Sequence, residues 1–130
     1  MDTPKDIITL SSPYSVKETV DRLEGLLQSK GATIFARIDQ QAAARQAGLD
    51  MPPTELLLFG NPKAGTALML AKPLSGLDLP LKVLAWQDKE GKPWLSYNSF
   101  SYLQRRFSLP DDLIHPVAMV EGLIKAAVAS

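Results

Sequence analysis

The turn at residues 60–66, Gly-Asn-Pro-Lys-Ala-Gly-Thr, is the segment of this sequence best suited to bind a ligand. The strand predicted at residues 55–59 contains the apolar run 56–59, which fits a buried strand, and Asn61-Pro62 then predicts a helix cap followed by a proline at the first helical position. Backbone N–H groups at a helix start can bind an anion, and Lys63 adds a positive charge there. The candidate ligand-binding residues of this turn are Asn61, Lys63, Gly65 and Thr66.

Two other interpretations of the turn are open. Its two glycines, separated by four residues and with threonine after the second, resemble the phosphate-binding loop of nucleotide hydrolases. The lysine that should follow the second glycine is absent and Pro62 removes a backbone donor, so nucleotide hydrolysis is not expected. The structural alternative is that Asn61 caps the helix, Pro62 sets its first dihedral angle, and Gly65 lets the helix approach the sheet closely.

Three carboxylates lie at ends of expected strands, where catalytic groups often gather: Asp39, Glu55 and Asp88. A general acid or base in an enzyme would be sought among them. Capping or turn formation explains Asp39 and Asp88 adequately, and no spacing shows that two of the three converge. We keep a carboxylate-dependent enzyme as an alternative and assign no catalytic residue.

Metal and thiol chemistry find little support in the composition. The chain has no cysteine and a single histidine, His115, so neither a sulfur-based zinc site nor a pair of imidazoles is available. Asp111 and Asp112, near that histidine in the sequence, are expected to cap a helix whose first turn contains it. We therefore expect no metal and no cofactor.

Aromatic side chains form the last group with binding potential. Trp86, Trp94, Tyr97 and Tyr102 pair apolar rings with polar tips and suit either a pocket or a core and dimer interface. We add Tyr97, together with Asp39, to the candidate ligand-binding residues. An exposed pair of tryptophan strands would instead indicate a structural, protein-interaction module.

Charge and length limit the function classes. Fourteen basic residues balance fourteen acidic ones in 130 residues, with no basic cluster that would bind a nucleic acid. No apolar run is long enough for a membrane span, and the first residues do not resemble a signal peptide, so a cytoplasmic location is expected. Near-zero net charge favours a homo-oligomer.

Periodicity predicts the elements that must position these residues. Alternating or β-branched runs predict five strands, at residues 7–10, 33–38, 55–59, 81–86 and 93–97. Helical spacing and cap signals predict helices after Ser15, over residues 40–47, from Pro62, around residues 102–107, and a final one from Asp111 through Ile124. Gly31 is expected to end the first helix, and residues 73–80 to form a loop.

This order of elements indicates an α+β fold. Residues 1–130 are expected to form a single two-layer domain, with a mainly antiparallel sheet of about five strands and helices packed largely on one face.

Several segments together resemble an uncharacterised bacterial and archaeal family, domain of unknown function number 302. They are Ile38-Asp39 after Gly31, residues 55–62, Gly65-Thr66-Ala67-Leu68-Met69, Leu79-Pro-Leu-Lys-Val-Leu84, Gly91 and Tyr97. The resemblance implies a compact domain with a curved antiparallel sheet, shaped like half of the TATA-box-binding protein, and a homodimer. The chain has Gln40 where many relatives have histidine. Similarity of shape implies no DNA binding, and the family has no established activity.

Our leading hypothesis from the sequence is a small homodimeric domain that binds a small polar or anionic ligand without catalysing a reaction. The structural or protein-interaction module and the carboxylate-dependent enzyme are the alternatives.

Overall fold

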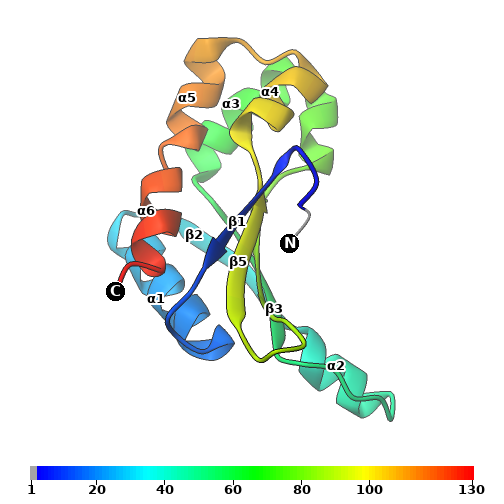
Figure 1. The fold of residues 1–130 in the computed structure, drawn as a ribbon. Coiled ribbons are helices and arrows are strands. Elements are labelled where there is room, and N and C mark those ends of the chain that lie inside the picture. Colours follow the sequence, from blue (N-terminus) through cyan, green and yellow to red (C-terminus); the bar gives the residue numbers. More distant parts are fainter. Residues whose placement is uncertain (1–2) are drawn as a thin grey trace.

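A computed structural model describes residues 3–130 of the chain. One five-stranded sheet, in the order β1-β5-β4-β3-β2, forms its centre, and all of its strand pairs are antiparallel (Figure 1). The strands are β1 (Ile7–Ser11), β2 (Thr33–Asp39), β3 (Thr54–Gly60), β4 (Leu81–Gln87) and β5 (Pro93–Asn98). The helices are α1 (Val16–Ser29), α2 (Gln40–Gln46), α3 (Pro62–Ala71), the 3₁₀ helix η1 (Pro73–Leu77), α4 (Phe100–Phe107), α5 (Asp111–Ala118) and α6 (Glu121–Ala127). The predicted α+β class is confirmed.

The first helix begins and ends where the sequence predicted. The Ser15 hydroxyl accepts a hydrogen bond from the Glu18 N–H at 3.1 Å, which satisfies one of the free donors of the first turn. Gly31, just beyond the helix, adopts a φ of 81°, a left-handed conformation that glycine allows without a steric penalty. These two signals set the first and last residues of α1. The apolar residues between them lie on one side of the helix and pack against the sheet.

Helices α1 and α6 lie together along one face of the sheet (Figure 1). The side chains that meet there alternate along the central strands, and Leu57, Ala85 and Leu95 are fully buried. The first hydrophobic cluster consists of Val16, Val20, Leu23, Leu27, Leu57, Phe59, Val83, Ala85, Leu95, Tyr97, Ile124 and Ala127.

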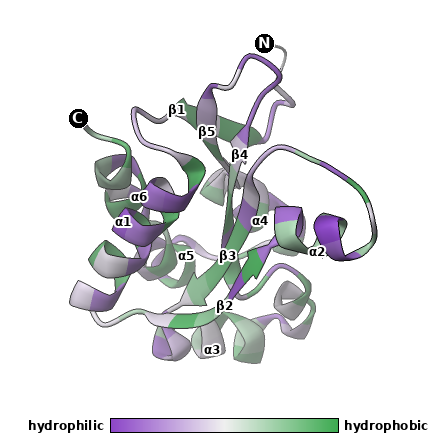
Figure 2. Ribbon diagram, turned by 90° about the horizontal axis from the view of Figure 1, so that it is seen from below, coloured by the Kyte–Doolittle hydropathy of each residue, from purple (hydrophilic) through white to green (hydrophobic). Residues whose placement is uncertain are grey.

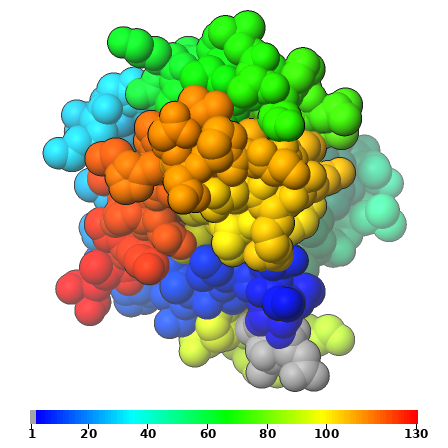
Figure 3. All heavy atoms as spheres, turned by 90° about the horizontal axis from the view of Figure 1, so that it is seen from above, coloured from blue at the N-terminus to red at the C-terminus, as the bar shows by residue number. Residues whose placement is uncertain are grey.

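A second hydrophobic cluster lies at one end of the sheet, where α3, α4 and α5 gather (Figure 1). It consists of Leu68, Leu103, Leu109, Ile114 and Val117. In the space-filling view along that end, the green α3 segment borders the orange α5 segment (Figure 3). The molecule therefore has two apolar centres, and the seam between them is where an unfilled volume can occur.

In the described part of the chain, residues 3–130, no helix packs along the middle of the opposite face of the sheet. Residues that alternate with the buried ones, such as Leu56, Leu58 and Leu84, are only half buried, and Ile38 is exposed. Figure 2 shows that the central strand β3 is largely hydrophobic along its length. Helix α2 has no buried residue and projects from one end of the sheet (Figure 1). The prediction that helices cover mainly one face agrees with this arrangement.

The prediction of one final helix through Ile124 is wrong, because the chain forms two helices there. At the break, the Val120 N–H donates to the Val117 carbonyl at 3.5 Å, three residues back along the chain instead of the four of an α-helix. Val117 of α5 belongs to the second cluster, whereas Ile124 of α6 belongs to the first. One straight helix could not place Val117 in the second cluster and Ile124 in the first. Packing against the two clusters therefore breaks the helix, although the apolar stripe in the sequence is continuous. The expected loop at residues 73–80 likewise contains the helix η1.

Candidate functional site

A groove of about 980 Å³ lies at the seam between the two hydrophobic clusters. Its volume is at the upper end of the range of about 300–1,000 Å³ typical of small-molecule sites. Its walls come from the ends of β2 and β3, the first two turns of α3, the segment before β4, and the α5–α6 turn. The lining residues from the sheet and α3 are Lys30, Ala32, Phe35, Phe59, Gly60, Asn61, Pro62, Ala64, Gly65, Thr66 and Met69. Those from the later segments are Leu79, Pro80, Leu81, Pro116, Val117, Met119, Val120 and Leu123.

Several large apolar side chains remain accessible at this groove. Phe35 is 53% exposed, Met69 38% and Met119 69%. Each lines the groove rather than an unrelated part of the surface. Apolar side chains that converge on a concave site without being covered are characteristic of ligand-binding surfaces.

A β-bulge brings Phe35 to the groove. The pairing of β2 with β3 shifts between Ile34 and Ala36, so Phe35 is the extra residue of its strand. Its ring lies beside Gly60, where a Cβ would meet the Phe35 Cε2 atom at 3.7 Å. Sequence reasoning placed this phenylalanine in a regular strand and missed its role in the site. Two adjacent apolar residues, Ile34 and Phe35, were the available signal, since they break the alternation.

The Asn61 cap forms as predicted. The Asn61 Oδ1 atom accepts hydrogen bonds from the N–H groups of Lys63 at 3.0 Å and Ala64 at 3.4 Å. The Gly65 N–H donates to the Asn61 carbonyl at 2.9 Å, and Pro62 has no N–H. The first turn of α3 therefore already has acceptors for its backbone donors, and an anion held by those donors would have to displace the asparagine cap.

Gly65 does not have the packing role that the structural interpretation gave it. A Cβ built on Gly65 would meet nothing within 4 Å, so the helix does not press against the sheet at this position. Because Gly65 lines the groove, the space left by its missing side chain opens onto the groove. The expectation of close helix–sheet approach is wrong, and the glycine instead widens the site.

The other candidate ligand-binding residues are not all brought together. Asn61, Gly65 and Thr66 line the groove, whereas Lys63 is exposed on α3 outside its lining. Asp39 lies at the far end of β2, where it pairs in register with Glu55 and caps α2 by accepting from the Ala42 N–H at 2.9 Å. Three of these candidate residues therefore lie together at the groove, and Lys63 and Asp39 lie outside it.

Tyr97 points into the first hydrophobic cluster rather than the groove. Its hydroxyl donates to the Glu121 Oε2 atom at 2.6 Å. Burial and the Glu121 carboxylate both raise the pKa of Tyr97, so the phenol stays protonated. Tyr97 lines a separate cavity of only about 20 Å³, too small for a ligand larger than water.

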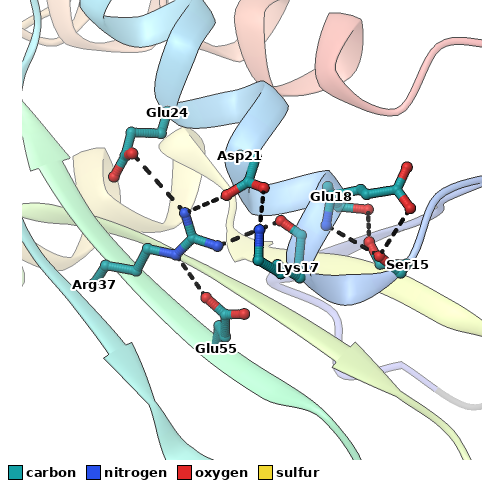
Figure 4. A network of polar contacts seen from close by, with 8 residues as sticks. Ser15, Lys17, Glu18, Asp21, Glu24, Arg37 and Glu55 are labelled. Carbon is teal, nitrogen blue, oxygen red and sulfur yellow. Dashed lines mark hydrogen bonds and ion pairs between the residues drawn. The ribbon is translucent and has the colours of Figure 1, made fainter.

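Glu55 takes part in an ion-pair network between the sheet and α1 (Figure 4). Arg37 donates to Glu55 at 2.6 Å and to Asp21 at 2.7 Å, and Lys17 donates to Asp21 at 2.8 Å. Burial opposes the charge of Arg37, but its hydrogen bonds with Glu55 and Asp21 outweigh burial and raise its pKa. The carboxylate of Glu55 therefore holds an arginine that joins α1 to the sheet.

Asp88 organises the turn between β4 and β5. It accepts hydrogen bonds from the Trp94 indole at 2.9 Å and from the Glu90 and Lys92 N–H groups, which together lower its pKa. The Trp94 ring stacks on Trp86, with ring centroids 6.3 Å apart. None of Asp39, Glu55 and Asp88 lines the groove.

His115 lies exposed in the last turn of α5, not in the first turn of a final helix. The predicted caps Asp111 and Asp112 lie inside the helix, which begins after Pro110 without a side-chain cap. Within residues 3–130, no group of three or more histidine, cysteine, aspartate or glutamate residues is placed to hold a metal ion. In the same part of the chain, no helix is both long and apolar enough to cross a bilayer.

Fold and site together define an α+β domain with a half-covered sheet and an apolar groove at one sheet end. The profile of the family described as "Domain of unknown function DUF302" matches residues 8–129, and the chain belongs to this family. A solved structure, "Crystal structure of uncharacterized conserved protein DUF302 from Bacillus stearothermophilus", superimposes with a TM-score of 0.79. The superposition covers 96% of this chain and 97% of that chain at 22% identity, a likeness that establishes the fold alone.

Curated relatives share a higher sequence identity with this chain than the Bacillus stearothermophilus protein does. The chain is 48% identical over 103 residues to "Fluoride-specific ion channel FluC 1" of Brucella suis biovar 1, which is 79% of this chain and 41% of that protein. It is also 48% identical over 103 residues to "Fluoride-specific ion channel FluC 2" of Brucella melitensis biotype 1, covering 38% of that protein. The chain thus spans about two fifths of the length of these relatives.

The Asn61 cap gives a first prediction. Asn61→Ala removes the acceptor for two N–H groups and should lower the free energy of unfolding by about 1 kcal/mol, whereas Asn61→Asp keeps an acceptor and should cost much less. Urea denaturation of the three proteins measures both values. Equal losses in the two variants would show that the cap bonds do not stabilise α3.

The Arg37 network predicts a pH dependence of stability. Hydrogen bonds from Lys17 and Arg37 hold the pKa of Asp21 below its ordinary value of 3.8. Because the folded-state pKa is the lower one, this stabilisation is complete above the unfolded-state value and is lost as the pH falls through the folded-state value. Asp21→Asn should therefore cost less than about 1 kcal/mol at pH 7, since the pair is partly exposed, and should lose less stability than the wild type under acid.

Urea denaturation at pH 7 and at steps below pH 4 measures this effect. Asp50→Asn is the matched control, because Asp50 is exposed and forms no hydrogen bond or ion pair among the described residues. Acid profiles of wild type and Asp21→Asn that run parallel would contradict the assignment.

Proposed function

We propose that this chain is a cytoplasmic, homodimeric domain that binds a small molecule without catalysing a reaction, with its ligand in the groove at the start of α3. The observation that carries the proposal is the groove of about 980 Å³ lined by Asn61, Gly65 and Thr66. These are three of the four turn residues that the sequence singled out. Binding is favoured over catalysis because the carboxylates Asp39, Glu55 and Asp88 all serve structural contacts away from the groove.

The half-covered sheet supports the homodimer part of the proposal. Ile38 is 38% exposed, and Leu56, Leu58 and Leu84 are half buried on the same face. A second copy packed against this face would remove their apolar surface from water. The alternative is that this face serves a different protein, with the stacked pair of Trp86 and Trp94 at its edge, and the chain is then an interaction module.

Gly65 allows a test that separates binding from folding. Gly65→Leu places a side chain in the groove where a Cβ meets nothing within 4 Å, and it replaces a poor helix former in α3. We expect the variant to be as stable as the wild type or more stable by up to about 1 kcal/mol, and to lose the ligand. Gly25→Leu is the matched control, because Gly25 also lies in a helix with open space at its Cβ and is not part of the groove.

Native mass spectrometry of the three purified proteins, followed by denaturation, measures both bound mass and oligomeric state. The proposal predicts a dimer with a co-purified small molecule in the wild type and in Gly25→Leu, and an empty dimer for Gly65→Leu. The same bound mass in Gly65→Leu would place the ligand elsewhere. An empty wild-type dimer would favour the interaction module, and a monomer would contradict the homodimer.

A second candidate function is a role beside fluoride transport. It is favoured by the 48% identity over 103 residues to Brucella proteins named fluoride-specific ion channels. On this hypothesis the chain acts as a partner of a membrane channel that conducts fluoride. Deleting its gene in the host should lower tolerance to sodium fluoride while leaving tolerance to sodium chloride at equal concentration unchanged. Unaltered growth in fluoride would contradict this role.

A further inference from the structure

We infer that the ligand of the groove is an amphipathic monoanion, with an aliphatic or aromatic body and a carboxylate at the end formed by Lys30 and Asn61. The inference rests on the proposed function, because it names the ligand class of the same groove. It changes the expectation from the sequence, in which a small polar anion was held by the start of α3 alone.

The charge of the groove favours a ligand with one negative charge. Among residues 3–130, Lys30 is the charged residue that lines it, and no acidic side chain of that part of the chain takes part in the lining. Within residues 3–130, the Lys30 ammonium forms none of the ion pairs or side-chain hydrogen bonds of the structure. A cation at the edge of an apolar groove, without a carboxylate beside it, is electrostatically complementary to an acidic head group.

The sheet register places Lys30 and Asn61 at the same end of the groove. Thr33 pairs with Gly60, so the chain enters β2 from Lys30 beside the point where it leaves β3 at Asn61. The cap directs Asn61 Oδ1 to the Lys63 and Ala64 N–H groups, which leaves the amide nitrogen as the donor that faces away from the helix. This amide nitrogen has no acceptor in the described part of the chain, so it is available to a carboxylate.

The rest of the groove suits a hydrocarbon body. Beyond Lys30, Asn61 and Thr66, its lining side chains are apolar or absent, and Phe35, Met69 and Met119 keep accessible surface there. A purely polar anion would leave this surface in contact with water. Each methylene group of a ligand buried against it should raise the affinity by roughly fourfold.

Three soluble probes separate the head group from the body. Isothermal titration of the purified protein with octanoate, 1-octanol and acetate tests the anion with its chain, the chain without the anion, and the anion without the chain. We expect octanoate to bind more tightly than 1-octanol, and acetate to show no binding at the same concentrations.

Variants then assign the two ends of the site. Lys30→Ala should weaken octanoate by roughly two- to fivefold, as expected for one exposed ion pair, and should leave 1-octanol unchanged. Lys89→Ala, at an exposed lysine of the β4–β5 turn, is the matched control and should bind both probes as the wild type does. Gly65→Leu should lose both probes.

The outcomes distinguish this inference from the proposed function. Equal affinity for octanoate and 1-octanol, or octanoate affinity unchanged in Lys30→Ala, would overturn the monoanion and leave the groove as a binding site. Failure of octanoate to bind while native mass spectrometry detects a different molecule, lost in Gly65→Leu, would overturn the ligand class alone. Failure of octanoate together with an empty wild-type protein would overturn both.

Discussion

Burial of one face of the sheet is the interaction on which the rest of the structure depends. Leu57, Ala85 and Leu95 are sealed under α1 and α6, and the Arg37 ion pairs hold α1 against β2 and β3 at the edge of this contact. Helices α1 and α6 leave uncovered the end of the sheet where β3 leads into α3. The chain therefore builds a second apolar cluster from α3, α4 and α5, and the break between α5 and α6 allows one segment to serve both.

The groove is a consequence of this division. Two well-packed clusters meet along a seam whose walls come from distant parts of the sequence, and small features keep the seam open. The bulge turns Phe35 toward it, Gly65 contributes no side chain, and the Asn61 cap fixes the direction of the turn between β3 and α3. The Asn61 cap already accepts hydrogen bonds from the first backbone N–H groups of α3. A ligand in the groove would therefore be bound by side chains and apolar surface, and not by those N–H groups.

The sequence predicted elements well wherever the signal was local. Each end of the five strands lies within one residue of the predicted range, and the caps at Ser15, Asp39 and Asn61 form as the sequence predicted. Predictions were wrong where long-range packing decides, as in the division of the last helix and the open space at Gly65. Of the site, the turn at Asn61 could be found from sequence. The contributions of Lys30 and Met119 could not, because no local pattern indicates which distant segments will border the same seam.

The central claim is that the groove itself is the binding surface, and methionine methyl NMR tests it most directly. Met69 and Met119 line the groove, whereas Met51 precedes β3 at the other end of that strand. With ¹³C-labelled methionine methyl groups, titration with octanoate should shift the Met69 and Met119 signals together along one binding curve and leave Met51 unchanged. Shifts of equal size at all three residues, or none at Met69 and Met119, would contradict the account.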